Sequence, residues 1–401
     1  LLVVVHRKEF FTVKFESSPR AAMMVSFVFI LSVVFALSGV FVEAQRYAAE
    51  IAYADAIRTD QAGGETDKVI ESLAHAADLN KSNDVYRRNL ALALLVKADR
   101  EFAAELKLEK NKDEKEEDYK ARLQTAQQEK VRKISQFTAA AVNTAKAATD
   151  INDKNVANWS VLGSIYQSLM GVTQGADEWA VKSYESAIAL EPGSPALHTE
   201  LGKVYLYQSD VAREGTQSKD EKVKKDAEDK VNDLLSKAVD AFNRAVELKS
   251  DYATARYNLS LALDRQGKLK EAITKMEEVV TLNPQDVGVG FQLSLMYFRD
   301  ERKGDAIKLL EQVVKISPKF SNALWYLAAM YEDKGDLDSA IAMIKRVQEL
   351  NADNELVTKK LDELNKKKSS PPPPSGAALP PPVEQPVQNQ NQPGVRPPAP
   401  K

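Results

Sequence analysis

ATARYNLSLALDRQGKLKEAITKMEEVVTLNPQD, residues 253–286, is followed by two segments of the same length and pattern. Residues 287–320 read VGVGFQLSLMYFRDERKGDAIKLLEQVVKISPKF, and residues 321–354 read SNALWYLAAMYEDKGDLDSAIAMIKRVQELNADN. The residues that recur at fixed positions are Leu259, Leu293 and Leu327, and also Ala272, Ala306 and Ala340. This fixed period of 34 residues predicts stacked helix pairs, because each pair can bury its apolar face only against its neighbours.

Small residues mark the places where the two helices of a pair are expected to approach closely. Ser260, Ser294 and Ala328 follow the repeated leucine in each first helix. Packed helices lie about 8–10 Å apart only where no bulky side chain intervenes. Glycines in the connecting loops predict helix ends in the left-handed conformation, and a proline closes two of the units. These residues are Gly267, Gly304 and Gly335, and Pro284 and Pro318.

The pattern resembles the tetratricopeptide repeat, and upstream segments carry its signature residues. The fullest copy comprises Trp159, Leu162, Gly163, Tyr166, Ala180, Tyr184, Ala187 and Pro192. A weaker copy comprises His198, Leu201, Gly202, Tyr205, Ala238, Phe242 and Ala245. The resemblance implies an all-α superhelix of about seven helix pairs. We divide it into degenerate units in residues 44–155, a regular array in residues 156–354 and a capping helix in residues 355–368.

Two charged inserts interrupt the predicted array, at residues 107–133 and 213–233. Both mix acidic and basic residues and contain few large apolar ones. We expect solvated helical extensions or loops here, since mixed charge favours a solvated face over a nucleic-acid-binding surface.

A long apolar segment precedes the repeats. Residues 21–42 read AAMMVSFVFILSVVFALSGVFV, without a charge. About 20 helical residues cross a hydrocarbon core of roughly 30 Å, so residues 21–43 predict a transmembrane helix. The alternatives are a buried helix of a soluble protein and a signal peptide cleaved after Ala44.

Residues 1–20 are interpreted as a cytoplasmic loop or the end of a preceding membrane segment. They contain Arg7, Lys8, Lys14 and Arg20, and the chain begins with Leu1. Because basic loops tend to remain in the cytoplasm, the repeats are expected on the outer side of a bacterial cytoplasmic membrane.

Composition limits the chemistry that the chain can perform. With 55 basic and 58 acidic residues the formal net charge is −3, which does not favour nucleic acid as a partner. The chain has no cysteine and only three histidines, none with a partner at metal-ligand spacing. We therefore expect no catalytic, cofactor or metal site.

Residues 369–401 form a proline-rich tail that contains PPPP at 371–374. Proline fixes its backbone torsion and lacks an amide hydrogen, so a disordered or extended spacer is expected. Its PxxP matches could also be recognised by aromatic grooves.

The tetratricopeptide resemblance implies a peptide-binding groove along the first helices of the repeats. Transferring the family's inward-facing positions gives an aromatic ladder and polar companions. The candidate residues are Lys203, Tyr257, Asp264, Arg265, Phe291, Phe298, Arg299, Trp325 and Glu332, with Asp333 beside them. Aromatic residues at these positions also serve packing in such repeats.

Residues 21–354 further resemble the carboxyl-terminal part of multi-spanning bacterial O-antigen ligase or polymerase-like proteins. The stretch that carries this resemblance is residues 155–195. The sequence thus predicts a membrane-anchored scaffold for protein–protein interactions at the cell envelope. Two alternatives stay open: an accessory domain of a glycan ligase whose catalytic part lies outside this chain, and a secreted binding module.

Overall fold

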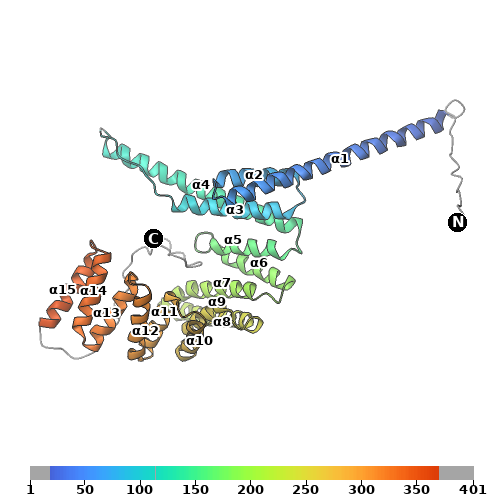
Figure 1. Ribbon diagram of the computed structural model, residues 1–401. Helices are drawn as coiled ribbons and strands as arrows, with labels where there is room; N and C mark the ends of the chain where they lie inside the picture. The colour runs from blue at the N-terminus through green and yellow to red at the C-terminus, as the bar shows by residue number, and fades with distance from the viewer. Residues whose placement is uncertain (1–18, 113, 370–401) are drawn as a thin grey trace, which may run out of the picture. The chain divides into compact units, whose positions relative to one another are not determined.

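The computed structural model describes residues 19–112 and 114–369, and these residues are almost entirely helical (Figure 1). The predictions for residues 1–18 and for the proline-rich tail lie outside them. The described residues contain fifteen α-helices and one short 3₁₀ helix. They form two compact units that meet within one helix, at Ile165 and Tyr166. The predicted border between degenerate and regular repeats, at residues 155 and 156, lies nearby.

The first unit is built from the four helices α1 to α4 and the start of α5. Their bounds are α1 Pro19–Gln61, α2 Thr66–Leu79, α3 Asp84–Ala103, α4 Glu116–Ile151 and α5 Val156–Ser168. Helix α1 packs against α2, α2 against α3, and α3 against α4. Ala49 of α1, Ala76 of α2 and Tyr86 of α3 are fully or almost fully buried together, which joins the two helix pairs.

Helix α1 is a single continuous helix of 43 residues. It includes both the apolar segment and the first helix of the first pair, which we predicted as separate elements. Residues 23–42 of α1 are exposed at every large apolar side chain, whereas Ala49 and Ala56 are buried against α2 and α3. The predicted transmembrane segment therefore continues directly into the repeats.

The second unit continues with the remaining helices, which again follow one another as antiparallel pairs and a last single helix (Figure 1). Their bounds are α6 Ala176–Leu190, α7 Pro195–Arg213, η1 Glu214–Gln217, α8 Glu221–Leu248, α9 Ala253–Arg265, α10 Leu269–Leu282, α11 Val287–Arg299, α12 Lys303–Ile316, α13 Ser321–Lys334, α14 Leu337–Leu350 and α15 Glu355–Ser369. The helices of each pair from α7 to α14 pack together, and α15 packs on α14. The expected capping helix is present.

The small residues of the repeat lie where the helices of a pair meet. Ser260 is fully buried, and its hydroxyl donates a 2.7 Å hydrogen bond to the carbonyl oxygen of Ala272 in the partner helix. Gly202 lies against Phe242, and a Cβ atom added there would stand 2.6 Å from the Phe242 ring. Side chains at these positions must therefore be small, because larger ones would push the two helices of a pair apart.

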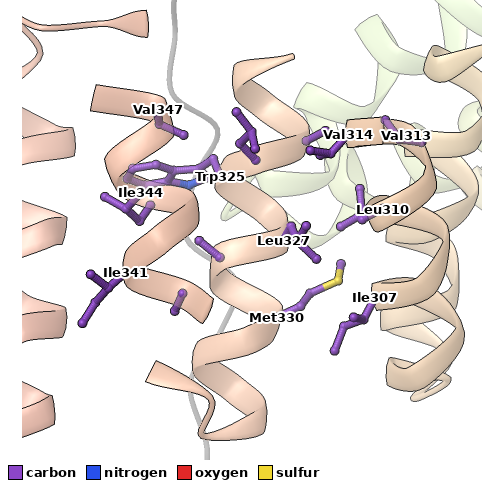
Figure 2. Close-up of a cluster of buried hydrophobic side chains, with 14 of the residues drawn as sticks. Ile307, Leu310, Val313, Val314, Trp325, Leu327, Met330, Ile341, Ile344 and Val347 are labelled. Atoms are coloured by element: carbon purple, nitrogen blue, oxygen red, sulfur yellow. The ribbon is translucent and has the colours of Figure 1, made fainter. Parts of the chain in front are cut away.

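The core of the last repeats is a continuous apolar cluster between α12, α13, α14 and α15. Figure 2 shows its side chains pointing toward one another from neighbouring helices, among them Leu310, Leu327 and Ile344. Val357 and Leu364 of α15 are fully buried in the same cluster. Helix α15 thus covers the apolar face that the last pair would otherwise expose to water.

The helix-ending residues follow the repeat with one exception. Gly267 and Gly335 have φ values of 78° and 84°, in the left-handed region. In the repeat between them this position is held by Glu301, whose φ is 60°. We predicted that Gly304 ends a helix, and this was wrong. Gly304 lies in the first turn of α12. The turn is kept because its backbone hydrogen bonds, such as Arg302 N to Tyr297 O at 2.8 Å, are those of the flanking repeats.

Both charged inserts are mainly helical extensions. Residues 116–133 form the first half of α4, and residues 221–233 the start of α8. The connection before α4 is held by Arg122, which bonds Glu114 at 2.7 Å and the carbonyl oxygen of Glu109 at 2.8 Å. Asp220 caps α8 by accepting a 2.9 Å hydrogen bond from Lys222 N.

Candidate functional site

The predicted aromatic residues lie on the first helices of three successive repeats in the second unit. We call the surface formed by Tyr257, Leu261, Phe291, Leu295, Phe298 and Trp325 the first-helix face. Tyr257 lies on α9, Phe291 and Phe298 on α11, and Trp325 on α13. All except Trp325 are partly exposed.

Phe291 links two repeats through an aromatic cluster. Its ring centroid lies 5.2 Å from that of Phe320 and 5.5 Å from that of Tyr326, in tilted and edge-on arrangements. Such geometries are favourable because the edge of one ring meets the face of another. Phe291 therefore contributes to packing between repeats as well as to the surface.

Trp325 belongs to the core as much as to the face. Only 6% of it is exposed, and it lies beside Ile344 and Val347 of α14 (Figure 2). The sequence predicted that Trp325 lines the groove as an accessible aromatic residue. Its indole Nε1 is buried without a hydrogen-bond partner among the described residues. A buried donor left in this way costs about 1–3 kcal/mol.

Tyr257 is partly buried at the other end of the face. Burial, together with the negative charge of Asp286, raises the pKa of its hydroxyl above the ordinary value. The group therefore remains a neutral hydrogen-bond donor over the physiological range.

The predicted polar companions are paired with one another or with neighbouring residues. Arg265 of α9 forms two hydrogen bonds with Asp210 of α7, at 2.8 and 2.9 Å. Arg299 of α11 bonds Asp264 of α9 at 2.6 Å. Each of these pairs connects the first helices of consecutive repeats.

The pairing continues at both ends of this row. Lys203 bonds Glu200 on its own helix at 2.7 Å, and Lys303 bonds Asp333 at 2.7 Å. Glu332 bonds Lys360 at 2.8 Å and also contacts Lys367, both on α15. Burial would raise the pKa of Glu332, but the hydrogen bonds from these two lysines outweigh it and hold the pKa below the ordinary value.

The charged candidate residues beside the first-helix face are thus all paired within the chain. Opposite charges at these distances neutralise each other locally, and the exposed members add little stability individually. The candidate polar residues therefore brace the repeats, and the surface between them offers mainly apolar and aromatic contact.

A set of hydrogen bonds between repeats was missed by sequence reasoning. Tyr205, Tyr297 and Tyr331 donate to Glu185, Glu277 and Glu311 of the preceding second helix, in each case 20 residues earlier. Burial, with the neighbouring glutamate, raises the pKa of each tyrosine to about 12. The constant spacing between tyrosine and glutamate is the signal that could have revealed these bonds.

A hollow of about 380 Å³ lies beside one of these bonds, between α10, α11 and α12. Arg302 lies over the Tyr297 ring at 4.0 Å from its centroid and bonds Glu277 at 3.1 Å. Arg302 also bonds Asp305 at 3.0 Å, so three of the charged residues that line this hollow are paired with one another. It contains none of the predicted site residues.

The apolar half of α1 is the second candidate surface. It is long and apolar enough to cross a membrane by length and composition, and none of the predicted span is buried. Two of its serines are satisfied within the helix, since the Ser32 and Ser38 hydroxyls donate 2.8 Å hydrogen bonds to Val28 O and Val34 O. Satisfied polar groups are what a bilayer requires of a spanning helix.

Comparison with known families and structures agrees with the repeat architecture. Residues 230–287 and 297–361 match two tetratricopeptide repeat families. No curated protein sequence matches this chain.

Several solved structures are similar in fold. A tetratricopeptide repeat-containing protein from Cytophaga hutchinsonii is 13% identical with a TM-score of 0.50, and the match covers 79% of this chain and 99% of that one. A tetratricopeptide repeat protein from Parabacteroides merdae is 14% identical with a TM-score of 0.47, over 80% and 99% of the two chains. YrrB, described as a repeat protein with an unusual peptide-binding site, is 17% identical with a TM-score of 0.40, over 54% and 97%. Residues 230–287 and 297–361 therefore carry tetratricopeptide repeats, and the described residues have the all-α fold of such repeat proteins.

Proposed function

We propose that this chain is a membrane-anchored scaffold that binds protein partners at the bacterial cell envelope. Tetratricopeptide repeats generally bind proteins or peptides, and the first-helix face is the surface we assign to this role. The observation that carries the proposal is the continuity of α1, whose exposed apolar half leads without a break into a stacked repeat array.

The first-helix face has the properties of a binding surface for a peptide. Tyr257, Phe291 and Phe298 each present part of an aromatic ring. Aromatic side chains bury a large area at small entropic cost, so they commonly carry most of the binding free energy. Because the ion pairs beside them are already formed, a partner gains most from apolar contacts.

The apolar half of α1 supports the anchoring role. Phe35, for example, is 82% exposed, and the surrounding large side chains from Met23 to Val42 are exposed too. About 20 residues at 1.5 Å each cover the roughly 30 Å hydrocarbon core of a bilayer. In this proposal the repeats lie on the outer side of the cytoplasmic membrane.

The binding role is tested by replacing Tyr257, Phe291 and Phe298 together with alanine in the full chain. We expect cross-linked partners to be lost from the purified protein while the helical circular dichroism signal is kept. Phe102→Ala is the matched control, because Phe102 is 67% exposed and lies on α3, which belongs to the first unit and not to the unit that carries the face. Retention of every partner by the triple variant would exclude the face as the binding surface.

The orientation is tested separately by protease protection with epitopes placed after α15 and before α1. We expect digestion of the repeats in spheroplasts without lysis. Digestion only after lysis would place the repeats in the cytoplasm.

A further inference from the structure

The first-helix face ends close to the point where the proline-rich tail leaves the last helix. Lys360 and Lys367 of α15 contact Glu332 on α13, and Lys368 contacts Asp338 at the start of α14. Ser369, the last described residue, directly follows them. The tail therefore starts beside the carboxyl-terminal end of α13, which carries Trp325.

The tail is long enough to reach the whole face. Residues 370–401 follow the described part of the chain. In an extended polyproline conformation they would span about 100 Å, at roughly 3.1 Å per residue. Trp325 precedes Glu332 by seven residues, a distance of about 10 Å along a helix. Neighbouring packed helices lie about 10 Å apart, so the repeats that carry Phe291 and Tyr257 are also within reach.

The chemistry of the tail matches that of the face. Between residues 370 and 400 the only charged residues are Glu384 and Arg396. The charged residues Asp264, Arg299 and Glu332 beside the face are likewise bound to partners within the chain. The uncharged proline runs at residues 371–374 and 380–382 can therefore contact the face without desolvating a charge of their own, which would oppose binding.

Trp325 adds a specific reason for a proline-rich ligand. Its Nε1 is a buried donor without an acceptor among the described residues. Proline has no amide hydrogen, so carbonyl oxygens in proline runs are left available as acceptors. Aromatic-lined grooves bind proline-rich segments because these are already extended and lose little entropy on binding.

We propose that the proline-rich tail, residues 370–401, binds the first-helix face of its own chain and competes there with external partners. This inference rests on the proposed function, since it uses the same surface, and it makes partner binding dependent on release of the tail.

The test uses the full chain in detergent and a fluorescent peptide of residues 370–400. In a tail variant, serine replaces the prolines of residues 371–374 and 380–382. We expect fluorescence anisotropy to show at least tenfold tighter binding of the peptide to the tail variant than to the native chain, whose own tail occupies the face. Equal affinity for both chains, or no binding to either, would overturn the inference.

The contact to Trp325 is tested with Trp325→Phe in the tail variant. This change removes the Nε1 donor but keeps an aromatic ring, and we expect a several-fold weaker affinity for the peptide. Trp179→Phe is the matched control, because Trp179 lies on α6, outside the face. An unchanged affinity in Trp325→Phe would refute the predicted hydrogen bond.

The outcome separates this inference from the proposed function. The tail variant could fail to bind the peptide while replacement of Tyr257, Phe291 and Phe298 still abolishes cross-linking to partners. In that case the face binds other proteins but not the tail, and only this inference fails. If those replacements change neither peptide binding nor partner binding, both proposals fail.

Discussion

Glu301 adopts a backbone conformation that glycine adopts in the two flanking repeats. Its φ of 60° lies in the left-handed region, where a Cβ atom comes too close to the following carbonyl oxygen. The turn is stabilised by the same backbone hydrogen bonds that surround Gly267 and Gly335, so the repeat imposes the conformation on a residue that resists it.

Glu301→Gly is expected to raise the free energy of unfolding by about 1 kcal/mol, because it removes this steric cost. Urea denaturation followed by circular dichroism measures the change. Glu301→Ala is the control, since it keeps the Cβ atom and removes only the 3.7 Å contact with Lys303. Equal stability of the glycine and alanine variants would contradict the argument.

The same position shows what sequence can and cannot predict at the residue scale. The buried small residues Ser260 and Ala272 followed directly from the repeat, since their size limits the helix separation. Gly304 was wrongly predicted to end a helix because glycine composition was used without the exact register. The burial of Trp325 could not be predicted, because it depends on α14 and α15 packing into the same cluster.

At the scale of the helices, the tyrosine–glutamate hydrogen bonds join three of the repeats to the one before each. Tyr297 on α11 bonds Glu277 on α10 at 2.8 Å, and Tyr205 and Tyr331 bond their glutamates in the same way. They are part of the repeat rather than of a single site, which explains their constant spacing in the sequence.

These bonds predict a loss of stability at alkaline pH. The folded-state pKa of each tyrosine is raised to about 12, whereas the ordinary pKa of a tyrosine hydroxyl is about 10. A raised pKa favours the protonated folded form, so this contribution is fully present below pH 10 and disappears as the pH rises toward 12. The denaturation midpoint, measured at a series of pH values from 8 to 12, should therefore decrease between pH 10 and pH 12.

The variant with Tyr205→Phe, Tyr297→Phe and Tyr331→Phe should be less stable at neutral pH and show a shallower fall above pH 10. Tyr119→Phe is the control, since the Tyr119 hydroxyl bonds a backbone carbonyl oxygen, that of Leu108, at 3.1 Å and not a carboxylate. An equally steep fall in the triple variant would assign the alkaline transition to other groups.

The existence and order of the helices were predicted where the repeat is regular, but their exact ends were not. The helices from α9 to α14 follow from the period, because each unit has the same two apolar stretches. The charged inserts were expected to be helical extensions or loops, and most of their residues belong to α4 and α8. Contacts such as that of Arg122 with Glu114 have no signature in a single sequence.

For the whole molecule, the period predicted the fold because stacked repeats interact only with their neighbours. The candidate binding surface was predicted by resemblance, and its role stays a proposal. The resemblance to glycan ligase or polymerase-like membrane proteins also stays a prediction, as does the location at the cell envelope.

The anchoring role predicts that charge in the apolar half of α1 will release the protein from membranes. Leu31→Arg with Phe35→Arg places two arginines near the middle of the span, each costing about 2.5–3.5 kcal/mol. We expect the double variant in the soluble fraction after carbonate extraction, with its helical signal retained. Phe102→Arg, a charge added on α3, should leave the protein in the membrane fraction, and pelleting of the double variant would contradict the anchor.

Because α1 is one continuous helix, a rotation of its apolar half is transmitted to the first helix pair. Ala49 and Ala56 are packed against α2 and α3. Any rotation or tilt of the segment around Phe35 therefore moves the first helix pair with it. One residue inserted between Val42 and Ala49 would swing that pair by about 100°, whereas four would bring it back to within about 40° of its original bearing.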